Sequence, residues 1–290
     1  MIQPVLSFSA EHGKLRLISL TVAAMVAFAA NSVLCRLALK TAAISPAGFT
    51  IIRLVAGAVV LWAILALRRR NHVSGGSWAG AVSLFVYAAA FSFAYVSLPA
   101  GTGALLLFGA VQVTMIAWGF RFGERMSPLQ SVGFALALSG IVLLMLPGLS
   151  APPLAGAALM IVAGVAWGVY SLLGRREDNP LAATSANFMR TVALAFGLAL
   201  LGWEGLKWDG IGVVYAVLSG GVASGVGYAI WYAALRGLSA TQAATVQLSV
   251  PVIAALGGVW FLTEPITWRL AVSATLTLGG IALVLRKKGS

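Results

Sequence analysis

The stretch FGERMSPLQSVGFALALSGIVLL at residues 122–144 has a counterpart in LTEPITWRLAVSATLTLGGIALV at residues 262–284. Upstream of each, FAYVSLPAGTGALL (93–106) matches YAALRGLSATQAAT (232–245) at nearly the same separation. The equivalent positions are Glu124 and Glu264, Ser127 and Thr267, Val132 and Val272, Gly140 and Gly280, and Ile141 and Ile281. An internal repeat filled with apolar spans is typical of transporters built from two halves around a central site.

The composition of the chain excludes a water-soluble globule. Of its 290 residues 60% are hydrophobic and 9% are charged, and the mean hydropathy is +0.98, whereas soluble domains carry about 25% charged residues. The single cysteine, Cys35, rules out an internal disulfide framework, and its place in an apolar span indicates a packing role. The net charge of +12 sits between spans, where membrane topology explains it better than nucleic-acid binding.

Hydropathy, with breaks at charges, proline and glycine, predicts an all-α integral membrane protein with ten transmembrane helices. Each candidate span holds roughly the 20 residues needed to cross a hydrocarbon core. Residues 1–14 are expected to form a polar tail without a cleavable signal, because the first apolar run is too long for one. The expected helices cover residues 17–39, 46–67, 77–97, 100–121, 127–146, 152–174, 180–202, 209–235, 239–262 and 267–286.

Positive charges in the loops predict the orientation of the chain. With the N-terminus inside, thirteen Lys and Arg residues fall in inner segments and three in outer ones, so both termini are predicted to be cytoplasmic in a multi-pass protein of the cell (inner) membrane. Five helices per repeat is an odd number, so the second repeat enters the membrane from the opposite face. The sequence therefore predicts two inverted-topology repeats, 1–148 (with the polar tail) and 149–290, with the Glu124 loop cytoplasmic and the Glu264 loop external.

Several motifs make the chain resemble the drug/metabolite transporter superfamily, in its ten-helix branch of paired EamA-type repeats. They are the Glu after the fourth and ninth helices (Glu124, Glu264), the Gly-Ile pairs of the fifth and tenth (Gly140-Ile141, Gly280-Ile281), an Arg early in the second and seventh (Arg53, Arg190), and QLSVPVIAAL (247–256) in the ninth. LPAGTGALLLF (98–108) and AWGVYSLLGR (166–175) are similar to a branch of aromatic amino-acid exporters. The chain departs from the pattern at Gln112, where the second repeat has Pro251, and at FAANSV (28–33), where many relatives carry a tryptophan.

Acidic side chains are absent from the middle of every expected span. All seven acids lie in the N-terminal tail or at helix ends, and both histidines lie outside the spans. Ion-coupled carriers commonly bind a proton or sodium ion on a membrane carboxylate, and the related small multidrug pumps have a Glu in their first helix, where this chain offers Asn31. Coupling through an intramembrane acid is therefore not expected. No cofactor or metal ion is predicted, and no G-x-x-x-x-G-K-[ST] loop for ATP occurs.

Arg53 and Arg190 are charges within expected spans, where each costs at least about 2.5 kcal/mol on insertion scales. Two roles fit them. They bind a carboxylate or phosphate of the substrate, or they reach loop carbonyls as structural or gating residues at mirror-related positions of the two repeats. Their symmetry favours the structural role.

Aromatic side chains are candidates for contact with substrate. They are Tyr87, Phe91 and Tyr95 on one face of the third helix, Trp167 and Tyr170 on the sixth, and Tyr228, Trp231 and Tyr232 on the eighth. Such stripes also fit packing or a lipid-facing surface. A cavity is favoured here because Tyr O–H and Trp N–H groups near the midplane need polar partners that lipid does not offer. Trp167, in the middle of its helix, ranks first among them.

Amide side chains complete the predicted site. An amide within a span either joins helices or faces a water-filled cavity, and the sequence leaves both roles open. The candidates are Asn31, Gln112, Asn187, Gln242 and Gln247, of which the last two suit the amino and carboxylate groups of a zwitterion.

Proline and glycine mark places where helices bend or approach. Pro99 and Pro251 are expected to kink spans where a gate moves. Gly225, in the pattern Gly221-xxx-Gly225, is expected to pack its helix closely against a neighbour and to take part in rocking.

These features predict a secondary transporter, not an enzyme, that exports small and largely apolar metabolites, above all aromatic or neutral amino acids, by facilitated alternating access. The alternatives are a channel and an antiporter of anionic metabolites, of the sugar-phosphate kind, that uses Arg53 and Arg190. An intramembrane enzyme has the least support, because it needs a nucleophile and base or metal ligands at membrane depth. The predicted partners are a small-molecule substrate and the lipid bilayer, not nucleic acid, and a monomer is compatible with the sequence.

Overall fold

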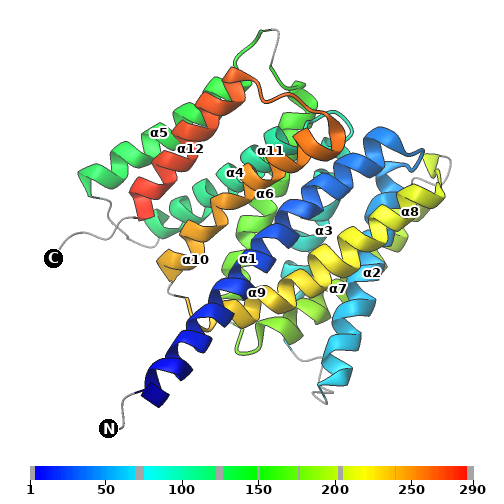
Figure 1. Ribbon diagram of the computed structural model, residues 1–290. Helices are drawn as coiled ribbons and strands as arrows, with labels where there is room; N and C mark the ends of the chain where they lie inside the picture. Colours follow the sequence, from blue (N-terminus) through cyan, green and yellow to red (C-terminus); the bar gives the residue numbers. More distant parts are fainter. Residues whose placement is uncertain are drawn as a thin grey trace.

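The computed structural model describes residues 4–68, 75–121, 127–148, 151–175, 177–201, 205–238 and 240–285. Regular secondary structure in these residues is helical throughout (Figure 1). The helices are α1 (Pro4–Thr41), α2 (Pro46–Leu67), α3 (Trp78–Ala94), α4 (Ala100–Arg121), α5 (Pro128–Met145), α6 (Leu154–Gly174), α7 (Pro180–Leu201), α8 (Gly210–Val217), the π-helix η2 (Leu218–Val226), α9 (Gly227–Leu235), α10 (Ala240–Gln247), α11 (Ser249–Leu262) and α12 (Trp268–Leu285).

The described helices make ten spans, and this confirms the predicted class of an all-α membrane protein. α8, η2 and α9 continue into one another as a single span, and only Leu248 separates α10 from α11. Eight spans are long and apolar enough to cross a membrane by length and composition, and α3 is apolar but shorter. The remaining span, α7, has the same 22-residue length as α2.

Short polar residues set where several spans begin. The hydroxyl of Ser45 accepts a hydrogen bond at 3.1 Å from an amide in the first turn of α2, and Pro46 is the first helical residue. The side chains of Ser77, Ser127 and Asp209 cap α3, α5 and α8 in the same way. Such caps satisfy amides that have no partner within the helix, and the predicted starts of these four helices lie within one residue of the observed ones.

The first helix differs from the expectation. α1 begins at Pro4 rather than at residue 17, so residues expected to form a polar tail are helical. Proline is favoured at the first position of a helix. After it, the segment contains one residue that weakens a helix, Gly13, and a single interior glycine costs only about 1 kcal/mol.

Two spans of the second repeat carry interruptions with physical causes. α10 ends at Gln247 because Pro251, four residues on, has no N–H for the Gln247 carbonyl and its ring crowds that carbonyl. The glycine-rich η2 takes a wider turn, and a Cβ at its Gly220 would overlap the carbonyl of Arg53 in α2. η2 can therefore lie directly against α2.

The spans form a bundle with one helix pair at its edge (Figure 1). α5 and α12 lie side by side there, and a Cβ at Gly280 would overlap the carbonyl of Gly133, so small residues permit their approach. Because the spans alternate in direction, the bundle has a terminal end, marked by Pro4 and Leu285, and a far end, marked by Thr41 and Thr263.

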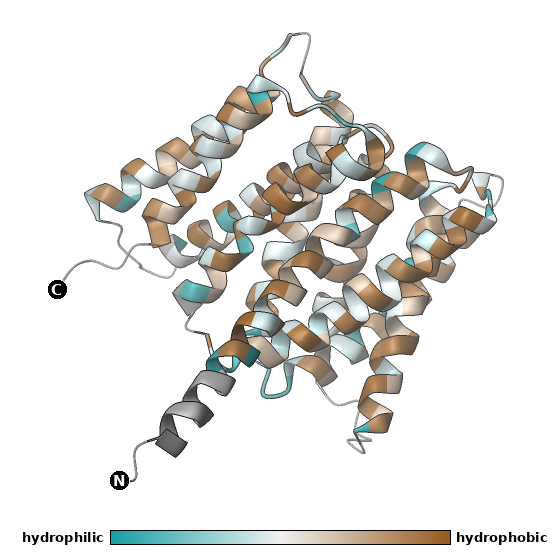
Figure 2. Ribbon diagram, viewed as in Figure 1, coloured by the Kyte–Doolittle hydropathy of each residue, from teal (hydrophilic) through white to brown (hydrophobic). Residues whose placement is uncertain are grey.

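The outer surface of the bundle is apolar. Hydrophobic residues run along most of each span (Figure 2). Large apolar side chains project outward, with Leu67 85% exposed and Trp260 83% exposed. Apolar surface of this extent is stable only when lipid covers it.

Candidate functional site

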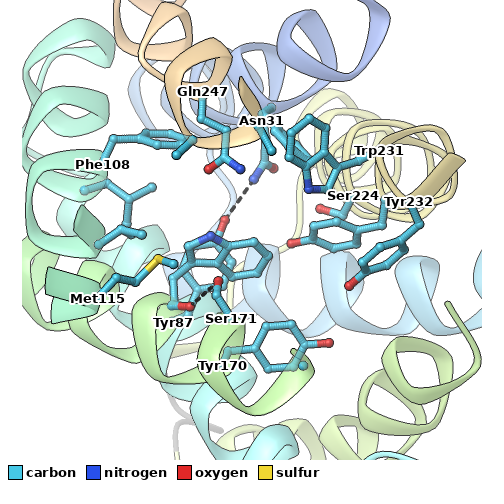
Figure 3. A pocket seen from close by; sticks show the side chains of 18 of the residues that line it. Asn31, Tyr87, Phe108, Met115, Tyr170, Ser171, Ser224, Trp231, Tyr232 and Gln247 are labelled. Atoms are coloured by element: carbon cyan, nitrogen blue, oxygen red, sulfur yellow. Dashed lines mark hydrogen bonds between the residues drawn. The ribbon is translucent and has the colours of Figure 1, made fainter. Parts of the chain in front are cut away.

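A cavity of about 350 Å³ lies inside the bundle (Figure 3). It is formed by α1, α3, α4, α6, η2 with α9, and α10. Its volume falls within the range of small-molecule sites, which begins at about 300 Å³. Two charged residues, Arg175 and Glu177, line the cavity. Its aromatic and uncharged polar lining comprises Phe28, Asn31, Ser32, Tyr87, Phe91, Phe108, Gln112, Trp167, Tyr170, Ser171, Ser224, Tyr228, Trp231, Tyr232 and Gln247.

Trp167 is the centre of an aromatic wall. Its ring is stacked on Tyr228, with centroids 5.5 Å apart and an interplanar angle of 17°, and on Tyr170, at 5.3 Å and 29°. The ring of Tyr87 lies 4.9 Å away at 46°. Helices α3, α6 and α9 each contribute to this wall, which offers flat apolar surface to a ligand.

Phe28 of α1 extends the aromatic wall and was not among the predicted contacts. Its ring centroid lies 5.8 Å from that of Tyr228 and 5.9 Å from that of Trp231. The internal repeat could have predicted this contact. Phe28 precedes Trp167 by the same separation that relates residues 93–106 to 232–245. Phe28 and Trp167 thus hold equivalent places in the two repeats.

A buried polar network joins the lining residues Asn31 and Tyr87 to Ser219 and Arg53, which lie outside the lining. Asn31 Nδ2 donates to Tyr87 Oη at 3.2 Å, and the hydroxyl of Ser219 donates to Asn31 Oδ1 at 2.5 Å. Arg53 Nη2 donates to the same Tyr87 oxygen at 2.9 Å. Arg53 as a residue is 2% exposed. Its guanidinium carbon lies 5.1 Å from the ring centroid of Tyr87 and 4.6 Å from that of Phe91. Helices α1, α2, α3 and η2 therefore meet at Tyr87.

A second hydroxyl chain joins α6, α7 and α9. Tyr170 Oη donates to Thr184 Oγ1 at 3.0 Å, and Thr184 Oγ1 lies 2.8 Å from Tyr232 Oη. Both tyrosines also line the cavity. Their rings therefore face the ligand space while Thr184 fixes their hydroxyl groups.

Arg36 and Glu264 close the far end. Arg36 Nε lies 2.9 Å from Glu264 Oε1, and Arg36 Nη1 donates to the carbonyls of Tyr95 and Val96 at 2.9 and 2.8 Å. Glu264 Oε2 accepts a hydrogen bond from the amide of Ala100 at 2.7 Å. This group, called the far-end latch below, ties α1 and the α3–α4 connection of the first repeat to the α11–α12 connection of the second.

The cavity reaches the terminal end. Gly174, Glu177 and Pro180, from the connection between α6 and α7, line it, as does Leu235 at the end of α9. None of the five residues of the far-end latch is part of the described lining. The site is therefore accessible from the terminal end and closed at the far end.

Ten of the thirteen predicted aromatic and amide candidates come together in the cavity wall. They are Asn31, Tyr87, Phe91, Gln112, Trp167, Tyr170, Tyr228, Trp231, Tyr232 and Gln247. Tyr95 lies apart, fully buried at the C-terminus of α3, where its hydroxyl donates to the carbonyl of Ala100 at 3.2 Å. Gln242 is exposed on α10, outside the lining, and Asn187 accepts from the amide of Ser77 at 2.9 Å.

The two arginines with matching positions in the repeats have different surroundings. Arg53 is buried beside the cavity wall, behind Tyr87. Arg190 is half-buried, and its Nη1 donates to the carbonyl of Gly75 at 3.4 Å. Neither is part of the lining, so the two do not form a joint anion site.

The predicted gating residues lie at helix contacts and connections. Pro99 directly precedes α4. Pro251 lines a separate apolar cavity of about 140 Å³ with Gly101 of α4. Gly225 packs against α2, where a Cβ would meet the side chain of Val60 at 3.0 Å. Glu124 lies outside the described residues.

The far-end latch was also missed by the sequence interpretation. Arg36 lies within the first expected span (17–39), and Glu264 is a residue of the repeat motif. A charged side chain at membrane depth calls for a partner, but the two residues are separated by 228 positions and nothing in the sequence pairs them.

The chemistry offered by the cavity is that of binding. No group of three His, Cys, Asp or Glu side chains suited to a metal ion occurs among the described residues. The wall supplies aromatic rings, amides and hydroxyls, which suit a small molecule with both apolar and polar parts.

Comparison with known families gives the class of protein to which this architecture belongs. The model of the EamA-like transporter family matches residues 15–146 and again residues 154–286. The chain therefore belongs to the EamA-like transporter family, a family of membrane transporters rather than enzymes.

Individual relatives agree with this assignment. An uncharacterized protein of Pseudomonas aeruginosa is 57% identical, over 93% of this chain and 94% of its own. A probable amino-acid metabolite efflux pump of Salmonella typhimurium is 26% identical, over 69% of this chain and 72% of its own. A solved crystal structure with 22% identity has a TM-score of 0.63, covering 91% of this chain and 96% of that one, and supports the fold.

Proposed function

We propose that this protein is a secondary transporter that exports small, largely apolar amino acids by alternating access. The observation that carries the proposal is a central cavity open at one end and closed at the other by the far-end latch. Alternating access exposes one central site to one side of the membrane at a time. The two repeats, residues 1–148 and 149–290, are proposed to supply the two gates.

The lining of the cavity supports amino acids as the substrate class. The stacked rings of Trp167, Tyr170 and Tyr228 suit an apolar or aromatic side chain, and the amides of Asn31, Gln112 and Gln247 suit the charged groups of a zwitterion. One relative carries the name of an amino-acid metabolite efflux pump.

The test of this function is counterflow into proteoliposomes that contain the purified protein. Liposomes loaded with unlabelled phenylalanine, threonine or a sugar phosphate are diluted into the same labelled compound. We expect saturable counterflow of neutral amino acids and none of sugar phosphate. Absence of amino-acid counterflow would refute the proposal, and single-channel currents would indicate a channel instead.

The terminal end is proposed to face the cytoplasm, so the cavity is open inward. The support is the excess of Lys and Arg in the segments at this end. Cysteines placed singly at Lys207 and Glu177, in a Cys35→Ala background, should react with an impermeant maleimide in intact cells at Lys207 and not at Glu177. The reverse pattern would overturn the orientation.

Transport is proposed to run down the substrate gradient without a coupling carboxylate. Among the described acids, Glu264 is held by Arg36, and the only one in the cavity lining, Glu177, lies at the mouth. Amino-acid efflux should therefore continue when ΔpH is collapsed with an ionophore. Loss of transport on that treatment would show proton coupling.

The separate surroundings of Arg53 and Arg190 do not favour the anionic antiporter. Such a carrier would use both arginines on one phosphate, and here one is buried behind Tyr87 and the other bonds to Gly75. We therefore retain amino-acid export as the proposed function.

A further inference from the structure

Tyr87 lies between the cavity and a buried positive charge. Its side chain lines the cavity, and its oxygen accepts a hydrogen bond from Asn31 Nδ2 at 3.2 Å (Figure 3). The same oxygen accepts a hydrogen bond from Arg53 Nη2 at 2.9 Å. A phenolic hydroxyl has one proton and accepts at its oxygen lone pairs. With both acceptor positions occupied, the Tyr87 proton is left to be donated to a third partner.

Arg53 gives this hydroxyl an unusual electrostatic setting. Among the described residues the one ion pair joins Arg36 to Glu264, so Arg53 has no carboxylate partner. Its Nη1 is buried and has no hydrogen-bond partner in the described part of the chain. A buried guanidinium without a counterion is strongly destabilising, and a negative charge brought to the neighbouring cavity relieves that cost.

The position of Asn31 fixes the direction of donation. The hydroxyl of Ser219, which is fully buried, donates to Asn31 Oδ1, and this orients Asn31 Nδ2 toward Tyr87. Donors therefore approach the Tyr87 oxygen from α1 and α2. Because Tyr87 and Asn31 both line the cavity, a ligand bound there is the partner available to the remaining Tyr87 proton.

We infer that the Tyr87 hydroxyl, with the Arg53 guanidinium behind it, binds the carboxylate of the transported amino acid. This inference rests on the proposed function and assigns one end of the substrate to one place in the cavity. Trp167, with its ring 4.9 Å from that of Tyr87, lies beside the apolar part of the same ligand. Arg53 acts through Tyr87 as a positioning residue, since it is not part of the lining.

Only the first repeat supplies this carboxylate site. Arg190, the counterpart of Arg53, donates to the carbonyl of Gly75, and no described hydrogen bond joins it to a tyrosine. The Tyr87–Arg53 pair therefore has no equivalent in the described part of the second repeat, and this asymmetry favours one orientation of the substrate in the cavity.

The test compares two ligands that differ only in the carboxylate. Binding of L-phenylalanine and of L-phenylalaninamide to the purified full-length protein is measured by isothermal titration calorimetry. Because a hydrogen bond to a charged group contributes about 1.5–3 kcal/mol, the wild type should bind the acid roughly ten- to a hundred-fold more tightly. In Tyr87→Phe, which keeps the ring, that ratio should fall to about one while the affinity for the amide changes little.

Further variants separate the contribution of the Arg53 charge to carboxylate binding from that of the Tyr87 hydroxyl. Arg53→Met should also lower the ratio, and Arg53→Lys, which keeps a positive charge, should restore part of it. Tyr215→Phe, on α8 outside the cavity lining, is the matched control and should leave the ratio unchanged.

The outcomes distinguish this inference from the proposed function. If the wild type transports amino acids but binds acid and amide equally, or if Tyr87→Phe keeps the wild-type ratio, the carboxylate site is refuted and the transport function stands. If the wild type neither transports nor binds any amino acid in the panel, both are refuted.

Discussion

The two ends of the central cavity are built from different interactions. At the far end an ion pair between Arg36 and Glu264 is reinforced by the backbone of Tyr95, Val96 and Ala100. At the terminal end the aromatic wall simply continues to a mouth beside the α6–α7 connection. Although the sequence is duplicated, an ion pair with backbone hydrogen bonds closes one end, and the other end is open at a mouth lined by Arg175 and Glu177.

This difference indicates how a membrane bundle can close reversibly. Charged and backbone groups that separate at a membrane surface exchange their hydrogen bonds for bonds to water, so the net free energy of a closed pair is small. Removing one partner of a buried pair costs much more, about 3–5 kcal/mol, because the other charge stays buried and unpaired. The far-end latch thus suits the gate that the proposed alternating-access cycle requires.

The largest expected effect comes from removing the cation of the far-end latch. Arg36→Met leaves the carboxylate of Glu264 buried without a cation, with only the Ala100 amide as donor, and should shift the equilibrium away from this conformation by a hundred-fold or more. Counterflow should fall at least ten-fold. A cysteine at Ser171, in the cavity wall, should then react with an impermeant maleimide from the far end as well as the terminal end.

The control for that experiment is the charge-reversed pair. Arg36→Glu combined with Glu264→Arg restores opposite charges and should regain part of the closure seen by maleimide labelling. Labelling confined to the terminal end in Arg36→Met would show that the far-end latch does not hold the gate.

The next effect concerns the aromatic wall. Trp167→Ala removes the ring stacked on Tyr170 and Tyr228 and should lower counterflow about ten-fold, since each aromatic pair contributes about 0.5–1.5 kcal/mol beyond its buried area. Thermal unfolding monitored in detergent should show folded protein. Trp260→Ala, at a site that is 83% exposed, is the control and should transport normally. Normal transport by Trp167→Ala would place the binding site elsewhere.

A smaller effect is expected in the scaffold behind the wall. Gly220→Ala introduces a Cβ that overlaps the carbonyl of Arg53, and overpacking of this kind costs about 1–3 kcal/mol. The melting temperature should drop by several degrees. Gly197→Ala in α7, where a Cβ meets nothing within 4 Å, should be neutral or slightly stabilising. Equal melting temperatures for the two variants would contradict the close approach of η2 to α2.

The smallest effect is expected at Lys40, one turn beyond Arg36. Its ammonium donates to the carbonyl of Leu262 at 3.1 Å, but the side chain is exposed and makes no ion pair in the described structure. Exposed charge interactions contribute about 0–1 kcal/mol. Lys40→Met should therefore change the counterflow rate less than two-fold. A loss comparable to that of Arg36→Met would extend the far-end latch to this residue.

Most of the fold was predictable because each span is decided locally. The transfer of an apolar segment into lipid depends on its own residues, and caps such as Ser45 and Asp209 act within one turn. The start of α1 was missed because the continuation of a helix beyond the membrane depends on propensity rather than hydropathy.

The sequence could only partly distinguish the aromatic residues that line the cavity from those that are buried elsewhere. Tyr87, Phe91 and Tyr95 share one helical face, yet the first two line the cavity and the third is sealed against Ala100 at the far end. The reason is the position of each residue along α3, because the cavity ends before it reaches Tyr95 at the far end. Periodicity gives the face of a helix but not the length of the space beside it.

The sequence by itself determined a duplicated membrane bundle, most of its helix boundaries and most of the aromatic and amide side chains from which the cavity is built. Only the tertiary structure decided that Arg36 meets Glu264, that Arg53 bonds to Tyr87 while Arg190 bonds to the carbonyl of Gly75, and that the terminal end is the open one. The free energy of inserting a span into the membrane is a sum of contributions from residues that are neighbours in the sequence. Contacts between helices more than a hundred residues apart depend instead on how closely small residues such as Gly220 let them approach.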